Sequence, residues 1–145
     1  MAARSGKAEL RRIYEQVVNK GKVDLIDELM SANFIEHEQL PPGVPPGIEG
    51  VKALFSEMRK AFPDLQATVH DMLEQGNKVV ARVTFSGTHK GEFMGIPPTN
   101  RKVSFQAIDI VRYARGKAVE HWGVADNAGL FQQLGVAPPG QPTQR

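Results

Sequence analysis

Apolar residues in the first half of the chain recur at the spacing of an α-helix. They predict an amphipathic helix over residues 7–19, a short helix over residues 25–30 and a third helix over residues 51–62. The apolar face of the first helix consists of Leu10, Ile13, Tyr14 and Val17. Residues 34–37 predict a short strand, and the proline- and glycine-rich residues 41–47 predict a loop. The first half is therefore expected to be mainly helical.

The second half changes to alternation between apolar and polar residues, which is typical of half-buried strands. Strands are predicted over residues 66–73, 79–86, 102–113 and 118–124. The segment from 114 to 117 reads Ala-Arg-Gly-Lys, which is a hairpin signal between the last two strands. We therefore expect an antiparallel meander.

Helices followed by antiparallel strands are typical of an α+β fold. We predict a cone in which a curved antiparallel sheet with a mixed edge packs on three N-terminal helices and encloses a pocket. A final helical turn is expected between Asp126 as its N-cap and Gly135 as its end. The 145 residues are expected to form a single domain over residues 1–135, followed by a proline-rich flexible tail over residues 136–145.

Composition excludes several classes of function. The net charge is only +2 and the basic residues are scattered, so nucleic acid is not an expected partner. The chain has no cysteine and its 4 histidines show no zinc-ligand spacing, so no metal is expected. Glycine-rich phosphate-binding motifs and a GxSxG motif are absent, which argues against nucleotide and serine-hydrolase chemistry. The first residues contain no continuous apolar stretch, and we expect a cytoplasmic protein without a membrane span.

Residues 109–126 bring together acids, an imidazole and an indole on two adjacent strands. A carboxylate beside the indole of Trp122 would be partly desolvated. Desolvation makes a carboxylate a stronger base, suited to taking a proton from a carbon next to a carbonyl. Other interpretations stay open, because Asp126 can serve only as a helix cap and His121 can point to solvent.

Residues that resemble a known family are spread along the chain. The longest segment is FSGTHKGEFMGIPPT over residues 85–99, and it is joined by Asp109-Ile110, Gly116-Lys117 and Glu120-His121-Trp122. Further matching positions are Asn19-Lys20-Gly21, His37, Gly50 and Ala61-Phe62-Pro63-Asp64. With these residues the chain resembles the SnoaL-like polyketide cyclases, also called ester cyclases, over nearly its whole length before the tail.

This resemblance implies the cone-shaped fold of the nuclear-transport-factor-like superfamily. It also implies an intramolecular aldol condensation that closes the final ring of an aromatic polyketide ester, with an aspartate as general base and acid and with no metal or organic cofactor. The matching aspartate is Asp126. The expected catalytic residues are Asp126, His121 and His37, the two histidines as hydrogen-bond donors to a substrate carbonyl. The expected substrate-binding residues are Tyr14, Trp122, Phe93, Asp109 and Arg82.

Several functions stay open from the sequence. The first is this acid and base chemistry, as cyclisation or isomerisation, on a small hydrophobic ligand that carries a carbonyl group. The second is a binding protein without catalysis that uses the same pocket. The third is hydrolysis of an epoxide or ester by a cluster of Asp109, Arg112 and Asp126, although Asp109 and Arg112 should lie on opposite faces of a regular strand. The uncovered face of the sheet leads us to expect a homodimer.

Overall fold

Helices and strands follow one another in the order that the sequence predicts. The computed structural model describes residues 5–136. Its helical elements are α1 (Gly6–Arg12), the π-helical η1 (Ile13–Val18), the 3-10 helix η2 (Val23–Leu25), α2 (Ile26–Leu29), α3 (Gly47–Ala61) and α4 (Asn127–Leu134). Its strands are β1 (Met30–Glu36), β2 (Gln66–Gln75), β3 (Lys78–Thr88), β4 (Lys102–Ala114) and β5 (Lys117–Ala125). The predicted elements are confirmed, with the first helix changing from α to π at Ile13.

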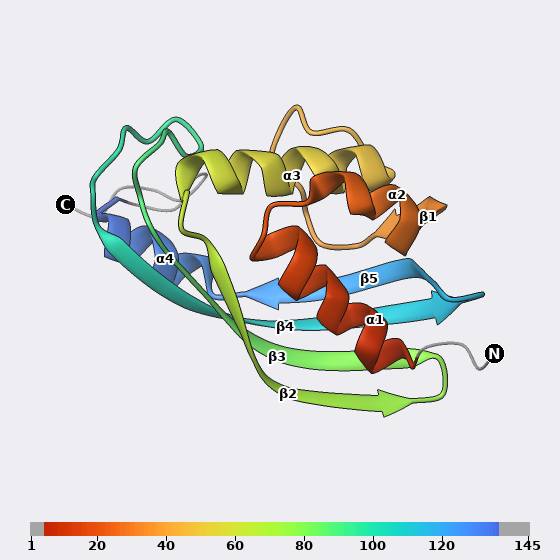
Figure 1. Ribbon diagram of the computed structural model, residues 1–145. Coiled ribbons are helices and arrows are strands. Elements are labelled where there is room, and N and C mark those ends of the chain that lie inside the picture. Colours follow the sequence, from red (N-terminus) through yellow and green to blue (C-terminus); the bar gives the residue numbers. More distant parts are fainter. Residues whose placement is uncertain (1–4, 137–145) are drawn as a thin grey trace.

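The strands form one open sheet in the order β1-β5-β4-β3-β2. Strands β2 to β5 pair antiparallel with their neighbours along the chain, whereas β1 pairs parallel with β5. The predicted α+β fold, with an antiparallel sheet and a mixed edge, is confirmed. The register shifts between Val69 and Asp71 and between Arg112 and Tyr113, and such irregularities increase the twist and bend of a sheet. Figure 1 shows the curved sheet with α1, α2 and α3 on the same face.

The inner face of the sheet packs against these helices to form the core. In β3, Val79, Ala81 and Val83 are at most 1% exposed, whereas Arg82 between them is exposed. Val17 of η1 is also 1% exposed. Burial of one such valine contributes roughly 1.5 kcal/mol or more to stability. Alternation along each strand therefore separates a buried inner face from an outer face that no helix of residues 5–136 covers.

Hydrogen bonds hold the end of η1 over the sheet. The guanidinium of Arg59 donates to the carbonyl oxygens of Val18 and Asn19 at 2.9 and 3.0 Å. The side chain of Asn19 accepts from the N–H of Ala67 at 2.6 Å and donates to its carbonyl oxygen at 3.2 Å. These bonds satisfy carbonyl groups that the end of a helix leaves without partners, and they tie η1 to both α3 and β2.

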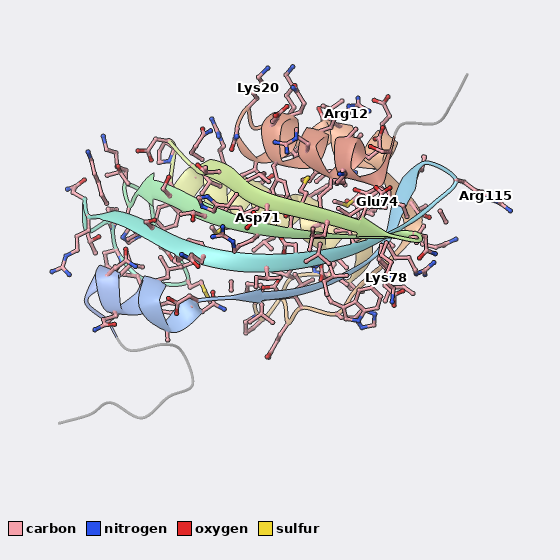
Figure 2. All side chains as sticks on the ribbon, turned by 90° about the horizontal axis from the view of Figure 1, so that it is seen from below. Arg12, Lys20, Asp71, Glu74, Lys78 and Arg115 are labelled. Atoms are coloured by element: carbon pink, nitrogen blue, oxygen red, sulfur yellow. The ribbon has the colours of Figure 1, made fainter. Side chains whose placement is uncertain are left out.

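Charged side chains of both signs are spread over the exposed surface. Figure 2 shows examples on α1, in the turn after η1, on β2 and at the turns between strands, namely Arg12, Lys20, Asp71, Glu74, Lys78 and Arg115. Among the helices that the structure describes, none is both long and apolar enough to cross a lipid bilayer.

The C-terminal part of the described chain ends at α4. Gly135 has a φ of 81° and ends this helix, as predicted. The tail predicted over residues 136–145 lies outside the described residues except for Val136.

Candidate active site

A cavity of about 620 Å³ lies between the inner face of the sheet and the helices. Much of its wall is apolar and includes Phe34, Phe55, Phe85, Phe93, Phe105 and Phe131. The ionisable side chains in the wall are those of Tyr14, Glu36, Glu38, Asp109 and His121. A cavity of this size with a few convergent polar groups is typical of a site for a small organic ligand.

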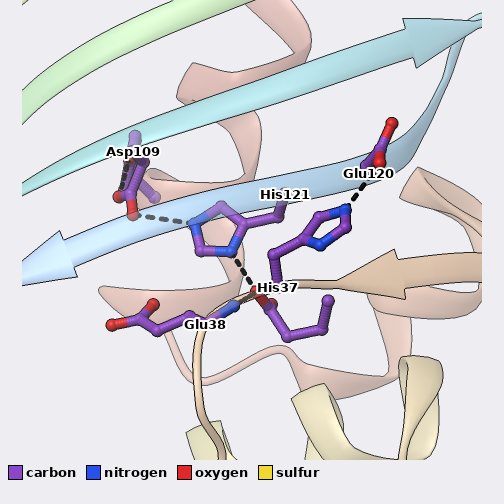
Figure 3. Close-up of polar contacts among 7 residues, drawn as sticks. His37, Glu38, Asp109, Glu120 and His121 are labelled. Atoms are coloured by element: carbon purple, nitrogen blue, oxygen red, sulfur yellow. Dashed lines mark hydrogen bonds and ion pairs between the residues drawn. The ribbon is translucent and has the colours of Figure 1, made fainter.

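Four of these ionisable side chains form a continuous hydrogen-bond network. The hydroxyl of Tyr14 donates to Oδ2 of Asp109 at 2.5 Å. Nε2 of His121 lies 2.8 Å from Oδ1 of Asp109, and Nδ1 of His121 lies 2.5 Å from Oε1 of Glu36. The side chains of His121, Asp109 and Glu36 are only 14, 13 and 10% exposed. The imidazole thus lies between two carboxylates (Figure 3), and all three side chains belong to the wall of the cavity.

Strand pairing brings this network to one face of the sheet. Asp109 pairs with Gly123 and Val111 pairs with His121, so Asp109 and His121 both face inward. Glu36 lies opposite His121 across the parallel pair of β1 and β5. Gly123 leaves the space that the imidazole occupies, because a Cβ at this position would lie 2.7 Å from Cε1 of His121.

Tyr14 reaches the network from the π-helical segment η1. Its side chain is 4% exposed, and its ring lies 6.5 Å from that of Phe85, measured between centroids. Single turns of π-helix recur at functional sites because they change the direction of side chains on a helix. The irregular turn therefore belongs to the part of the helix that delivers the hydroxyl to Asp109.

The positive charge of the network resides on His121. Burial disfavours the imidazolium, but hydrogen bonds to Asp109 and Glu36 outweigh burial and raise the pKa of His121 to about 10. At neutral pH both ring nitrogens therefore carry protons and act as donors. Burial, followed by the charge of Asp109, raises the pKa of the Tyr14 hydroxyl, so this group also keeps its proton. Asp109 accepts a hydrogen bond on each of its two oxygens.

Ligand atoms of Glu36, Glu38 and His121 lie within 4.8 Å of one another. A metal ion would need a lone pair on the imidazole, whereas both nitrogens of the protonated ring donate to carboxylates. Metal binding would therefore require loss of a proton and of one short hydrogen bond. The donor set fits an ion-paired network better than a metal centre.

Four of the eight predicted site residues line the cavity and four do not. Tyr14, Phe93, Asp109 and His121 line its wall. Asp126 is exposed, and its Oδ1 accepts the N–H of Gly129 at 2.9 Å, which caps α4. The helix-cap interpretation is thus confirmed, and Asp126, the aspartate that the family resemblance implies as catalytic base, does not line the cavity.

Three other predicted site residues lie on the outer face of the sheet. His37 stacks on Trp122 with ring centroids 4.9 Å apart, and its Nε2 lies 2.6 Å from a carboxylate oxygen of Glu120 (Figure 3). Arg82 pairs with Asp71 at 2.7 Å. Trp122 and Arg82 each follow an inward-facing residue, so their own side chains point outward. The predicted placement of His37, Trp122 and Arg82 in the pocket is therefore wrong.

The acid and arginine cluster considered for hydrolysis does not form. Nε of Arg112 donates to Oε1 of Glu120 at 2.8 Å on the outer face, away from Asp109. Hydrogen bonds from His37 and Arg112 lower the pKa of Glu120, as expected for a structural ion pair. The strand alternation that separates Asp109 from Arg112 is confirmed.

Sequence reasoning missed two ionisable residues of the cavity, Glu36 and Glu38. The available signal was the spacing from Phe34, because residues at even distance from a buried strand residue face the same side. Phe34 is 6% exposed, and Glu36 follows it on the inner face.

A model of the family described as SnoaL-like polyketide cyclase matches residues 8–134. The aklanonic acid methyl ester cyclase DauD of Streptomyces sp. (strain C5) is 31% identical over 143 residues, which cover 93% of this chain and 85% of DauD. The nogalonic acid methyl ester cyclase of Streptomyces nogalater is 29% identical over 119 residues, which cover 81% of this chain and 88% of the relative.

Solved structures agree with this relationship. The crystal structure of wild-type IdmH from Streptomyces antibioticus superposes with a TM-score of 0.79 at 33% identity, covering 92% of this chain and 100% of IdmH. A polyketide cyclase structure from Bacillus cereus ATCC 10987 superposes with a TM-score of 0.76 at 37% identity, covering 90% of this chain and 80% of the other. Both the sequence match and the shared fold lead to one conclusion: the chain belongs to the SnoaL-like polyketide cyclase family.

Proposed function

We propose that this protein closes a ring in a polyketide ester by an intramolecular aldol reaction that needs no cofactor, with Asp109 as the general base. The observation that carries this proposal is the position of Asp109. It lies in the wall of an apolar cavity and is hydrogen-bonded to a protonated imidazole and a phenol. A carboxylate in such surroundings can take a proton from a carbon that lies between two carbonyl groups.

The aldol reaction divides into three proton and bond changes. Asp109 takes a proton from the acidic carbon, and the electrons of that C–H bond form an enolate. The enolate carbon attacks a second carbonyl carbon of the same molecule, which forms the new C–C bond and leaves an alkoxide. The alkoxide then takes a proton, so the product is an isomer of the substrate. The imidazolium of His121 offsets the negative charge that develops beside it.

The substrate class follows from the cavity and the relatives. The cavity of about 620 Å³ with its phenylalanine-rich wall suits a flat, largely aromatic molecule. Relatives of this chain are named as cyclases of nogalonic acid methyl ester and aklanonic acid methyl ester. We therefore propose an aromatic polyketide methyl ester with a β-dicarbonyl side chain as the substrate.

The direct test is incubation of the full chain with aklanonic acid methyl ester in buffer that contains EDTA, followed by chromatography of the open and ring-closed forms. The proposal expects ring closure well above the rate without protein, and no loss of rate with EDTA. Saturable binding that raises the melting temperature without any ring closure would overturn it and favour a binding protein.

We also propose that the outer face of the sheet joins two copies of the chain in a homodimer. Exposed apolar side chains on this face are Ile35 (48%), Leu73 (70%), Ile108 (49%) and Val124 (76%). Ile108 and Val124 pair across β4 and β5 and form one continuous patch. Sedimentation of the wild type as a dimer, and of Val124→Glu as a monomer, is expected. A monomeric wild type at micromolar concentration would contradict the proposal. A location in the cytoplasm stays a prediction.

A further inference from the structure

One carboxyl group of the cavity takes no part in the hydrogen-bond network. The backbone N–H of Glu38 donates to Oε1 of Glu36 at 2.9 Å, which fixes the start of its side chain. Within residues 5–136, however, the Glu38 carboxyl makes no hydrogen bond, although it lines the same cavity as Asp109. The reaction described above has no role for this group so far.

The position of this carboxyl depends on a glycine. A Cβ at Gly123 would lie 2.7 Å from Oε2 of Glu38 and 2.7 Å from Cε1 of His121. Glu38 therefore occupies space that another residue at position 123 would fill. In Figure 3, Glu38 and Asp109 lie on the same side of the His121 ring, away from His37. The carboxyl groups of Glu38 and Asp109 thus both lie near the His121 imidazolium, inside one cavity.

The surroundings of the two carboxyl groups differ. Asp109 accepts hydrogen bonds on both oxygens, from the Tyr14 hydroxyl and from the imidazolium of His121. Burial raises the pKa of Glu38; the charge of His121 opposes this effect, and the charges of Asp109 and Glu36 add to it. Glu38 consequently holds a proton up to a higher pH than an exposed glutamate does. Carboxyl pairs with such different surroundings often divide the roles of base and acid between them.

We propose that Glu38 is a catalytic residue of the ring closure, the general acid that protonates the new alkoxide. This assignment rests on the proposed aldol reaction. As the enolate carbon attacks the second carbonyl carbon, the O–H bond of the neutral Glu38 carboxyl breaks and its proton passes to the carbonyl oxygen, which becomes the hydroxyl of the product. Asp109 then holds the proton from carbon and Glu38 is anionic. Proton exchange with water after product release restores both groups, so the cycle has no net change in protons.

Two measurements on one substrate separate the base from the acid. In deuterium oxide, removal of the acidic proton is recorded as deuterium uptake in the remaining open-chain substrate, by mass spectrometry. Ring closure of aklanonic acid methyl ester is recorded by chromatography. Only the second measurement needs the general acid. The variants are Glu38→Gln, which keeps the shape of the side chain, and Glu49→Gln, a matched change on the exposed face of α3.

The expected result is a loss of ring closure by about 100- to 10,000-fold in Glu38→Gln, with deuterium uptake within about threefold of the wild type. Glu49→Gln should match the wild type in both. Ring closure at the wild-type rate in Glu38→Gln would overturn the assignment. A folded Glu38→Gln that loses both activities would also overturn it. A wild type that neither exchanges nor closes the substrate would instead refute the proposed function.

The wild type alone provides an independent readout. Because the acid must be protonated, the ratio of ring closure to deuterium uptake should fall as the pH rises through the pKa of Glu38. A ratio that stays constant with pH would contradict the assignment, even if Glu38→Gln failed to fold.

Discussion

His121 makes the stability of this protein depend on pH in an unusual direction. Its imidazolium donates to Asp109 and Glu36, and the side chain is 14% exposed. These bonds raise the pKa of His121 from its ordinary value of 6.5 to about 10, against the effect of burial. The variant His121→Gln removes the charge and leaves two buried carboxylates without their shared partner.

The sign and size of the effect follow from proton linkage. Between the unfolded pKa of 6.5 and the folded pKa of about 10, the folded state holds a proton on His121 that the unfolded state has lost. The free energy of unfolding should therefore fall by up to about 1.4 kcal/mol for each pH unit in this window. Across the whole window the loss reaches at most roughly 5 kcal/mol, which is comparable to the total stability of many small domains. The chain has no cysteine whose titration would obscure this trend.

Urea unfolding of the wild type and His121→Gln, followed by circular dichroism at several pH values from about 7 to about 10, measures this slope. The exposed histidine variant His70→Gln is the matched control and should keep the wild-type slope. The reasoning is refuted if the wild type has the same slope as His121→Gln, because the buried imidazolium would then be absent.

Further variants test the surroundings of the base and the loop next to the cavity. Tyr14→Phe removes the hydroxyl that donates to Asp109 and should lower kcat/KM for ring closure by about 10- to 100-fold with the fold intact; an unchanged kcat/KM would contradict this. Gly123→Ala places a methyl group 2.7 Å from the Glu38 carboxyl. The variant should lose a larger fraction of its ring-closure rate than of its free energy of unfolding. A variant with the wild-type rate would contradict this and show that the cavity can adjust. Burial lowers the pKa of His89, so protonation of this side chain favours the unfolded state. The free energy of unfolding, measured by urea titration, should therefore fall as pH drops from about 7 to about 5. His89→Asn should remove this decline.

The helices and strands could be predicted because each depends on local periodicity. The apolar positions of the first helix, for example, are buried as their spacing requires, with Leu10, Ile13 and Val17 at 2, 5 and 1% exposure. The cap at Asp126 and the stop at Gly135 were also readable, since both depend on the residue itself. Pattern and local chemistry were therefore sufficient for the individual helices and strands.

The site depended on pairings that periodicity does not determine. Alternation within a single strand relates Glu120 to Trp122, but it does not say which residues of β5 share a face with Asp109. The register across the hairpin, with its shift next to Tyr113, pairs Asp109 with Gly123 and so selects His121 instead of Trp122. A shift of one residue exchanges the two faces of a strand. The indole expected beside the carboxylate is therefore on the other side of the sheet.

Contacts between distant parts of the chain were still harder to foresee. Glu36 meets His121 through the parallel pairing of β1 with β5, which joins residues 85 positions apart. Tyr14 meets Asp109 across 95 positions, through a helix whose π-helical turn has no clear sequence signal. Tertiary packing determines both contacts.

The most direct test of the proposed mechanism compares two aspartates in the same assay. Asp109 lines the cavity, whereas Asp126 caps α4, and asparagine also serves well as an N-cap. With aklanonic acid methyl ester as substrate, Asp109→Asn should lose ring closure by about 100- to 10,000-fold while Asp126→Asn stays close to the wild type. The account is contradicted if Asp126→Asn loses the activity and a folded Asp109→Asn retains it.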